Sequence, residues 1–287
     1  MLRAAVIQLN TRNDKATNLV AIEAAVRDCV KKERPDWVQL PEHCEWLGGS
    51  GGAPAVAEPY RDGDTWTLLS RLSRELKVWI HGGSFYEQSE NPGRVYNTTV
   101  VFDRDGQERA RYRKIHLFDV TTADGAKFHE SATVDPGDAI VTYDCEGLTI
   151  GCSICYDVRF PELYQQLARQ GAQMIAVPAA FTLLTGKDHW EVLLRSRAIE
   201  TECWVAAAGQ WGSYQTPAGE RQSFGQSMII DPWGTVVARV SEGLGSASAG
   251  VDMGILNRVR SQIPVAANKA ISITASLAGA GLAGAGL

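Results

Sequence analysis

The stretch of sequence that decides the fold is Gly151-Cys152-Ser153-Ile154-Cys155-Tyr156-Asp157-Val158-Arg159-Phe160-Pro161-Glu162. Residues 147–154 predict a buried strand, and Pro161 suits the first turn of a helix over 161–170. Cys155 falls at the junction, where a side chain stands at the sheet edge beside the positive end of a helix. We therefore expect a reactive thiolate there. This context alone leaves a buried structural cysteine as the alternative.

The same alternation of strand and helix extends outward from this stretch. Further strands are predicted at 3–9, 36–40, 78–85, 95–103, 107–114, 174–178, 204–209, 226–230 and 235–240. Further helices are predicted at 16–33, 64–76 and 187–202. Helices alternating with strands, mixed with hairpins, indicate an α/β layered fold with mixed sheets. We divide the chain into one domain, 1–270, and an Ala/Gly-rich tail, 271–287, which has too little to bury.

Composition narrows the functional class. The 287 residues carry a net charge of −5, with basic and acidic residues spread along the chain. The absence of a basic patch predicts no nucleic-acid partner, and no apolar run is long enough for a membrane span. Six cysteines in a chain of this length do not form a disulfide framework. We therefore expect a soluble protein of the reducing cytoplasm.

Other patterns are weaker. Cys152 and Cys155 form a C-x-x-C, but no second Cys or Cys/His pair completes a zinc site. Strand alternation should also separate the two sulfurs, so Cys152 is interpreted as a core residue. A thiol oxidoreductase built on this pair is thus disfavoured. A G-x-G-x-x-G match at 279–284 has no strand–helix unit to follow it, and no G-x-S-x-G is present.

Two ionisable residues end predicted strands elsewhere. Glu42 follows Leu40-Pro41, and Lys114 stands in Tyr112-Arg113-Lys114-Ile115-His116-Leu117. Taken singly, Glu42 is often just a solvated loop residue and Lys114 is better explained as a surface strand residue. Taken with the stretch around Cys155, and with Glu130-Ser131 before Pro136-Gly137-Asp138, the four motifs resemble the nitrilase superfamily of carbon–nitrogen hydrolases. The resemblance covers roughly residues 3–268.

This resemblance implies an α-β-β-α sandwich and a homodimer or higher homo-oligomer. Two stretches are most similar to the deaminated glutathione amidase and ω-amidase branch: 189–201 and 231–238. Two positions depart from the family pattern. Gln226 stands where the family usually has His, and the segment after Pro264 lacks the usual aromatic and basic residues.

The resemblance also implies roles for individual residues. Cys155 is the nucleophile, Glu42 the general base and acid, and Lys114 with the backbone N–H of Tyr156 the oxyanion site. Glu130 is expected to hold Lys114 and the incoming amide. The expected substrate-binding residues are Phe181, Thr185 and Arg159. No metal ion or organic cofactor is needed.

We therefore predict an amidase that hydrolyses the terminal amide of a small keto-acid substrate, deaminated glutathione, to acid and ammonia through a thioester. One alternative is an ω-amidase acting on 2-oxoglutaramate or 2-oxosuccinamate, or a related hydrolase of small amides or nitriles. Another is a catalytically silent, ligand-binding member of the fold, which the intact Glu–Lys–Cys set argues against.

Overall fold

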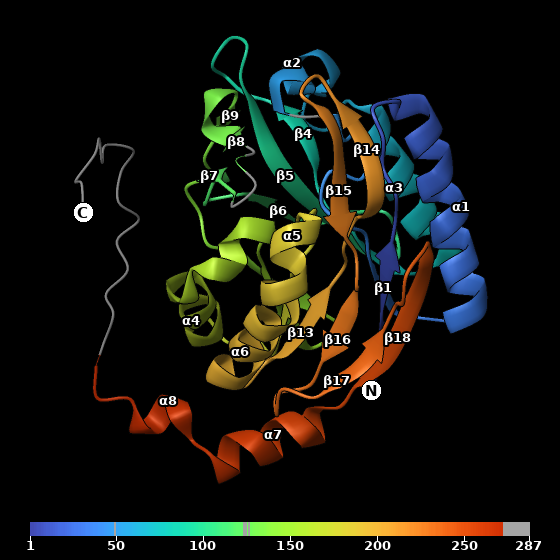
Figure 1. Ribbon diagram of the computed structural model, residues 1–287. Helices are drawn as coiled ribbons and strands as arrows, with labels where there is room; N and C mark the ends of the chain where they lie inside the picture. Colours follow the sequence, from blue (N-terminus) through green and yellow to red (C-terminus); the bar gives the residue numbers. More distant parts are fainter. Residues whose placement is uncertain (49, 123–124, 126, 272–287) are drawn as a thin grey trace.

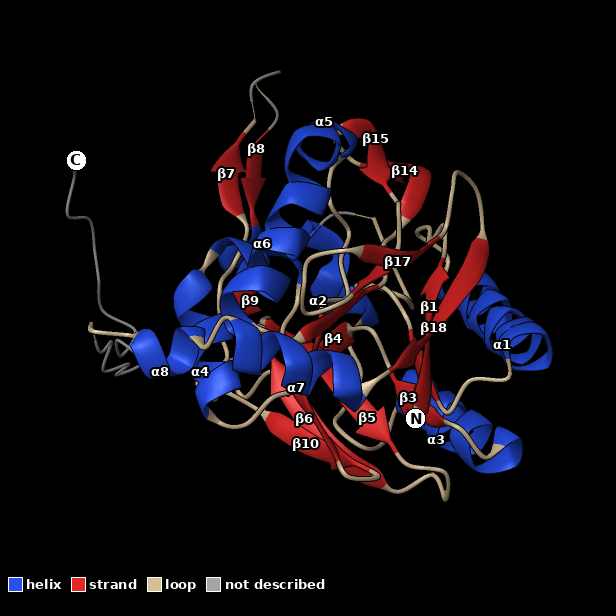
Figure 2. Ribbon diagram, turned by 90° about the horizontal axis from the view of Figure 1, so that it is seen from below, coloured by secondary structure: helices blue, strands red, loops and turns tan. Residues whose placement is uncertain are grey.

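Two β-sheets pack face to face and are covered on their outer sides by helices (Figures 1 and 2). The computed structural model describes residues 1–48, 50–122, 125 and 127–271. Helices α1 (Lys15–Glu33) and α3 (Asp64–Leu76) lie outside the first sheet, while α4 (Pro161–Arg169) and α6 (Glu191–Thr201) lie outside the second. The predicted α-β-β-α sandwich with mixed sheets is confirmed.

The first sheet has eight strands in the order β18-β1-β2-β3-β5-β4, with β6 and β9 also paired to β5. Strands β1, β2 and β3 run parallel, whereas β18, β4 and β6 are antiparallel to their neighbours. The strands are β1 (Leu2–Gln8), β2 (Trp37–Gln39), β3 (Trp79–His81), β4 (Phe85–Gln88), β5 (Val95–Phe102), β6 (Glu108–Arg113), β9 (Val134–Asp135) and β18 (Gly245–Val251).

The second sheet has six strands in the order β10-β11-β12-β13-β16-β17, and its three central strands are parallel. Its strands are β10 (Thr142–Cys145), β11 (Leu148–Cys152), β12 (Met174–Ala176), β13 (Trp204–Ala207), β16 (Met228–Ile230) and β17 (Val236–Arg239). Parallel strands of an α/β protein present their ligand site beyond their carboxyl ends. In both sheets those ends lead to the residues described below.

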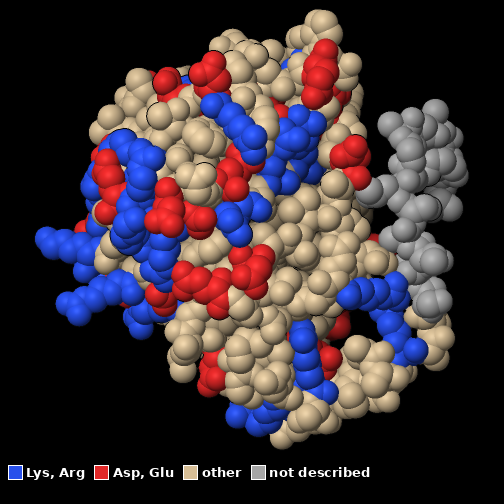
Figure 3. Space-filling view, turned by 180° about the vertical axis from the view of Figure 1, so that it is seen from behind, with Lys and Arg blue, Asp and Glu red and all other residues tan. Residues whose placement is uncertain are grey.

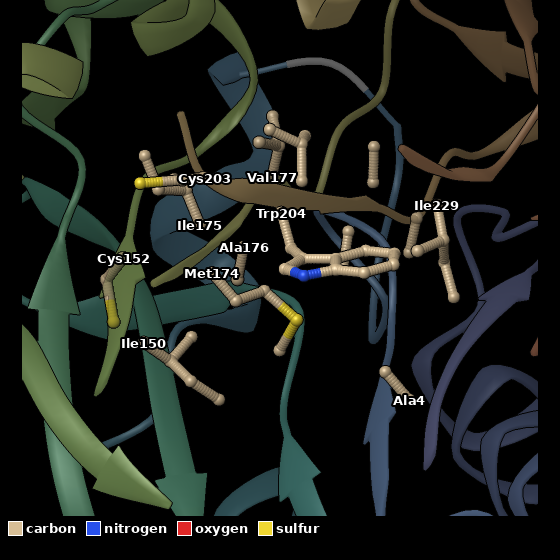
Figure 4. Packing of buried hydrophobic residues seen from close by; sticks show 14 of the residues in the cluster. Ala4, Ile150, Cys152, Met174, Ile175, Ala176, Val177, Cys203, Trp204 and Ile229 are labelled. Carbon is tan, nitrogen blue, oxygen red and sulfur yellow. The ribbon is translucent and has the colours of Figure 1, made fainter. Parts of the chain in front are cut away.

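Successive side chains of β1 point to opposite faces of the first sheet and so pack against two different layers. Ala4 and Val6 belong to the hydrophobic cluster between the sheets, whereas Ala5 and Ile7 belong to the cluster under α1 and α3. Trp204 lies at the centre of the inter-sheet packing, with Met174 and Ile229 beside it and Ala4 facing it from the first sheet (Figure 4). Cys152 is fully buried in the same cluster, so its predicted core placement is confirmed.

Two small hairpins lie at one end of the sandwich, near α5 (Leu183–Thr185), as both ribbon views show (Figures 1 and 2). One joins β7 (Asp119–Thr121) to β8 (Lys127–His129), and the other joins β14 (Trp211–Thr216) to β15 (Gly219–Phe224). The remaining helices are α2 (Ala53–Val56), α7 (Met253–Gln262), α8 (Val265–Asn268), the 3₁₀ turns 50–52, 130–132 and 155–159, and a π-helical turn at 186–190.

Most predicted elements are present, with two kinds of difference. The strand predicted over 78–85 is two strands, β3 and β4, because the chain turns at Gly82-Gly83-Ser84. Gly83 has φ +63°, and a Cβ there would lie 2.1 Å from the carbonyl oxygen of Pro41. The two hairpins, the strands β9, β10 and β18, and the helices α2, α5, α7 and α8 were not predicted. The predicted tail lies outside the described residues except for Ile271, as does the 279–284 motif.

Candidate active site

Glu42 lies just past the carboxyl end of β2, where Leu40 and Pro41 lead the chain out of the sheet. Its side chain is 2% exposed. One carboxylate oxygen accepts a hydrogen bond from the backbone N–H of Ala180 at 2.8 Å, and the other accepts from Asn97 Nδ2 at 3.0 Å. Glu42 is therefore held between the ends of the two sheets in one orientation.

Lys114 follows β6 and is equally buried. Its Nζ lies 2.9 Å from Glu42 Oε1 and 2.9 Å from Glu130 Oε2, so one ammonium bridges two carboxyl groups. Glu130 is fixed in turn because its Oε2 accepts the backbone N–H of Phe118 at 2.7 Å. The predicted association of Glu42, Lys114 and Glu130 is thus present in the structure.

Cys155 begins the turn that follows β11. Its φ is +47°, a left-handed conformation that is unfavourable for a residue with a Cβ. The turn is fixed on both sides: Cys155 N–H donates to Pro178 O at 2.8 Å, and buried Asp157 accepts from Ile154 N–H at 2.8 Å and from the hydroxyl of Tyr112 at 2.7 Å. Cys155 and Glu42 line the same cavity, and the thiol lies close enough to feel the negative charge of Glu42.

The electrostatics of this cluster define its resting state. Burial alone would raise the pKa of Glu42, but the Lys114 charge and its hydrogen bonds outweigh burial and lower that pKa well below its usual value. Burial opposes the charge on Lys114, yet Glu130 and Glu42 raise the pKa of its ammonium. Glu42 is therefore an ionised acceptor beside a permanent cation.

The expectation of a resting thiolate is wrong. Burial, followed by the negative charge of Glu42, raises the pKa of Cys155 well above that of a free thiol. The helix that was expected to stabilise a thiolate begins only at Pro161, and Cys155 starts a 3₁₀ turn of five residues. Burial and the Glu42 charge therefore favour the neutral thiol at rest.

The cluster forms the floor of a cavity of about 320 Å³. The walls include Tyr156, Phe181 and Thr185, but not Arg159. Arg159 lies behind the wall, where its guanidinium is 3.2 Å from His189 Nδ1 and stacks 5.3 Å from the Phe181 ring. The backbone N–H of Tyr156 is at the start of the turn, where the turn itself supplies no acceptor.

Comparisons with known proteins match this geometry. The family model described as carbon–nitrogen hydrolase matches residues 3–260. The chain belongs to the carbon–nitrogen hydrolase family. A deaminated glutathione amidase of Synechocystis is 41% identical over 269 residues, covering 91% of this chain and 95% of that protein. A human omega-amidase is 36% identical, covering 92% and 93%. The crystal structure of Saccharomyces cerevisiae Nit3, a nitrilase-superfamily member, is 30% identical with a TM-score of 0.83, covering 94% and 96%.

This carbon–nitrogen hydrolase is therefore an enzyme that hydrolyses carbon–nitrogen bonds other than peptide bonds, in amides. Three residues that shape its site were not predicted. Asn97 donates to both Glu42 and Glu130, Asp157 anchors the nucleophile turn, and His43 lines the cavity beside Glu42. Asp157 and His43 are close in sequence to predicted catalytic residues, so their place in the site could have been predicted. Nothing in the sequence around Asn97 indicated its role.

The two departures from the family pattern lie away from the chemistry of this hydrolase. Gln226 does not line the cavity: its carbonyl accepts from Trp190 Nε1 at 2.9 Å, and its side chain contacts Arg239. The segment after Pro264 forms α8, whose residues are largely exposed. Neither position touches the catalytic cluster.

One group in the hydrolase site has the composition of a metal centre. Oxygen or nitrogen atoms of Glu42, His43 and Glu130 lie within 4.8 Å of one another. Lys114 Nζ already bridges the two carboxyl groups at 2.9 Å, so a second cation would face an ammonium at close range. This group of residues is therefore better suited to binding the Lys114 ammonium than to binding a metal ion.

Proposed function

We propose that this enzyme hydrolyses amides of 2-oxo acids through a thioester on Cys155, with deaminated glutathione as the leading substrate. The observation that carries the proposal is that Cys155, Glu42 and Lys114 line one cavity, where Lys114 Nζ donates to Glu42 at 2.9 Å. The relatives named deaminated glutathione amidase support the substrate.

The mechanism follows from the protonation states at rest. Cys155 attacks the amide carbon while its proton passes to Glu42, whose lowered pKa beside Lys114 supports its role as an ionised acceptor. Lys114 and the N–H of Tyr156 stabilise the oxyanion, and one such donor contributes about 3–4 kcal/mol. Glu42 then protonates the departing nitrogen. Water, activated by the same carboxylate, attacks the thioester and releases the acid.

The nitrogen product distinguishes the two substrate candidates. A primary amide such as 2-oxoglutaramate releases ammonia, whereas the sequence-based prediction of ammonia from deaminated glutathione was chemically wrong. In deaminated glutathione the amide nitrogen carries cysteinylglycine, so hydrolysis releases that amine. The ω-amidase function remains the second candidate, because the human omega-amidase is 36% identical over 267 residues.

The test is to assay the purified enzyme against deaminated glutathione, 2-oxoglutaramate, simple aliphatic amides and nitriles, measuring both the acid and the nitrogen product. We expect the largest kcat/KM with deaminated glutathione and an acyl-enzyme mass adduct on the peptide containing Cys155. Turnover of aliphatic amides or nitriles without turnover of either oxo-acid amide would refute the substrate proposal.

Thiol labelling separates hydrolase from redox chemistry. All the cysteines at 29, 44, 145, 152, 155 and 203 are free. We expect iodoacetamide to label Cys155 and substrate to protect it. Recovery of a Cys152–Cys155 disulfide as the reactive form would favour an oxidoreductase.

Six free thiols also support our proposal that the enzyme works in the cytoplasm.

We also propose that two copies of the chain pair through α6. Val192 and Ile199, two helical turns apart on one face, are 67% and 50% exposed, and Trp233 is 54% exposed. The turn at Gly234 packs against Ile199, which joins these residues into one apolar patch. Replacing Ile199 with Glu should shift the mass measured by light scattering toward the monomer. The matched change Val20→Glu, at an exposed position on α1, should not.

Two observations bear on other partners. Among the described residues, no helix combines the length and apolar character that crossing a bilayer requires. Acidic and basic side chains are interspersed on the face shown in Figure 3. Nucleic acid requires a broad basic surface, so we propose that the partners of the enzyme are its small-molecule amide substrate and a second copy of itself.

A further inference from the structure

The mouth of the cavity carries two positive charges that the catalytic mechanism does not use. Lys127 comes from the β7–β8 hairpin and Arg221 from the β14–β15 hairpin, and both line the cavity. The hairpins meet there, because Arg221 Nη2 donates to the carbonyl oxygen of Lys127 at 3.3 Å. Figures 1 and 2 place both hairpins at the same end of the molecule as α5.

Arg221 is held in place without being neutralised. Its guanidinium carbon lies 4.1 Å from the centre of the Phe128 ring, so the planar group is stacked and half-buried. Within the part of the chain that the structure describes, neither Arg221 nor Lys127 forms an ion pair with a carboxylate, although many surface arginines do. A stacked guanidinium without a carboxylate partner is suited to bind the carboxylate of a ligand.

A continuous aromatic wall connects this arginine to the catalytic floor. The Tyr156 ring contacts the Phe118 ring at 5.0 Å, Phe118 contacts Phe128 at 5.0 Å, and Phe128 supports Arg221. Tyr156, Phe118, Phe128 and Arg221 all line the cavity that Cys155 lines, so a substrate with its amide at Cys155 can extend along this wall toward Arg221.

The charged residues at the floor and at the mouth determine the orientation of such a substrate in the cavity. At the floor, Glu42 and Glu130 share the single ammonium of Lys114. A carboxylate placed there would meet two acidic groups and one cation, whereas a neutral amide meets no such repulsion. At the mouth, a carboxylate meets only the cations Lys127 and Arg221 among the charged residues described as lining it.

We propose that Arg221, assisted by Lys127, binds a carboxylate of the amide substrate and so determines specificity for acidic amides. The inference rests on the amidase function proposed above. It differs from the sequence-based assignment of this role to Arg159, whose guanidinium lies outside the cavity against His189, Tyr156 and Phe181. The bound carboxylate belongs either to the acyl half of the amide or to its amine half.

The experiment compares kcat/KM across four amides: one with a carboxylate on both halves, one on the acyl half only, one on the amine half only, and one with none. In Arg221→Gln we expect the preference for acidic over neutral amides to fall by about 10- to 100-fold. The half whose carboxylate no longer improves kcat/KM is the half that Arg221 binds. Arg221→Lys should restore part of the preference, because it keeps the charge but not the planar donors.

Two comparison variants make the result specific. Arg74→Gln, at an exposed position on α3 away from the cavity, should retain the wild-type preference. Equal losses for acidic and neutral amides in Arg221→Gln would overturn the inference, and so would loss of the preference in Arg159→Gln alone. If the wild type hydrolyses no oxo-acid amide, the proposed function fails. If it hydrolyses acidic amides and Arg221→Gln keeps the preference, only this inference fails.

Discussion

The floor and the mouth of the cavity are built in different ways. At the floor, Glu42, Lys114 and Cys155 follow strands of the two sheets, Glu130 follows β8, and all four residues are at most 7% exposed. Lys114 Nζ lies 2.9 Å from both Glu42 and Glu130. The mouth is formed by two short hairpins that lie outside both sheets, and its cations are partly or fully exposed.

This difference assigns bond cleavage to the floor and substrate selection to the mouth. The floor is fixed by the packing of the sandwich, so its geometry cannot change without disturbing the core. The hairpins lie outside both sheets, and surface segments of this kind tolerate change better than the sheets that carry them. Substitutions at the floor should therefore affect every substrate alike, whereas substitutions nearer the mouth should affect only some substrates.

The largest expected effect is at Cys155. Cys155→Ala removes the nucleophile, so hydrolysis of every amide should fall to the detection limit while the far-ultraviolet circular dichroism remains unchanged. The matched control is Cys152→Ala, which deletes a buried thiol from the core and should keep most activity at a cost of about 1–2 kcal/mol in stability. Residual wild-type turnover in Cys155→Ala would refute the thioester mechanism.

The next effect concerns the pair that supports the nucleophile. Glu42→Gln and Lys114→Ala should each reduce kcat by about 100- to 10,000-fold, for acidic and neutral amides alike. Lys114→Ala also leaves two buried carboxyl groups without their cation, so it should lower the free energy of unfolding by about 3–5 kcal/mol. Urea denaturation checks this.

The double variant tests whether the two residues act together. Because both serve one proton-transfer and oxyanion unit, the loss in the double variant should be close to the larger single loss. A loss equal to the product of the two single losses would show that Glu42 and Lys114 contribute independently.

A smaller and substrate-dependent effect is expected at the cavity wall. The Thr185 hydroxyl lies 2.8 Å from that of Thr182, and both residues line the cavity. Thr185→Val keeps the side-chain volume but removes the hydroxyl. It should raise the Michaelis constant about tenfold for oxo-acid amides and little for simple aliphatic amides, which have no group to pair with it. Equal changes for both classes would exclude Thr185 as a residue that recognises the keto acid.

The floor and the mouth of the cavity also differ in how much of each could be predicted from the sequence. Four residues of the floor were predicted by the resemblance of their motifs to the nitrilase superfamily. The apolar runs that stop at Leu40-Pro41 and Ile154-Cys155 indicated only that Glu42 and Cys155 follow strands. The hairpins were missed because their strands are short and mostly polar, with little hydrophobic alternation. The contact between Lys127 and Arg221 joins residues 94 positions apart, which no local pattern can indicate.

The thiolate prediction failed for a related reason. Local sequence placed Cys155 beside a helix start, but its proton affinity depends on burial and on Glu42, which is far away in the chain. Long-range electrostatics thus decides the protonation state, while local pattern decides only the position.

The smallest expected effect is on the pH dependence of stability, and it arises in the core near the floor. His81 is fully buried between Trp37 and Tyr143, and neither ring nitrogen has a hydrogen-bond partner among the described residues. Burial lowers the pKa of His81 from 6.5 to about 3. The folded state therefore holds the neutral ring, whereas the unfolded chain takes up a proton below pH 6.5. His81 thus contributes stability that is present above pH 6.5 and is lost as the pH falls toward 3, by about 1.4 kcal/mol per pH unit at most.

A second buried group changes the stability with pH in the opposite direction. The contribution of His81 must therefore be measured as the difference between two proteins. Burial raises the pKa of Glu45 to about 8, and its contribution is present below pH 4.5 and lost as the pH rises to 8. Urea unfolding of the wild type and of His81→Phe between pH 7 and pH 5 cancels the Glu45 contribution, because both proteins retain it. The wild type should lose about 1–2 kcal/mol more than His81→Phe over this range. Parallel curves for the two proteins would show that the histidine is solvated or paired, and that the core near the floor is less tightly closed than its burial indicates.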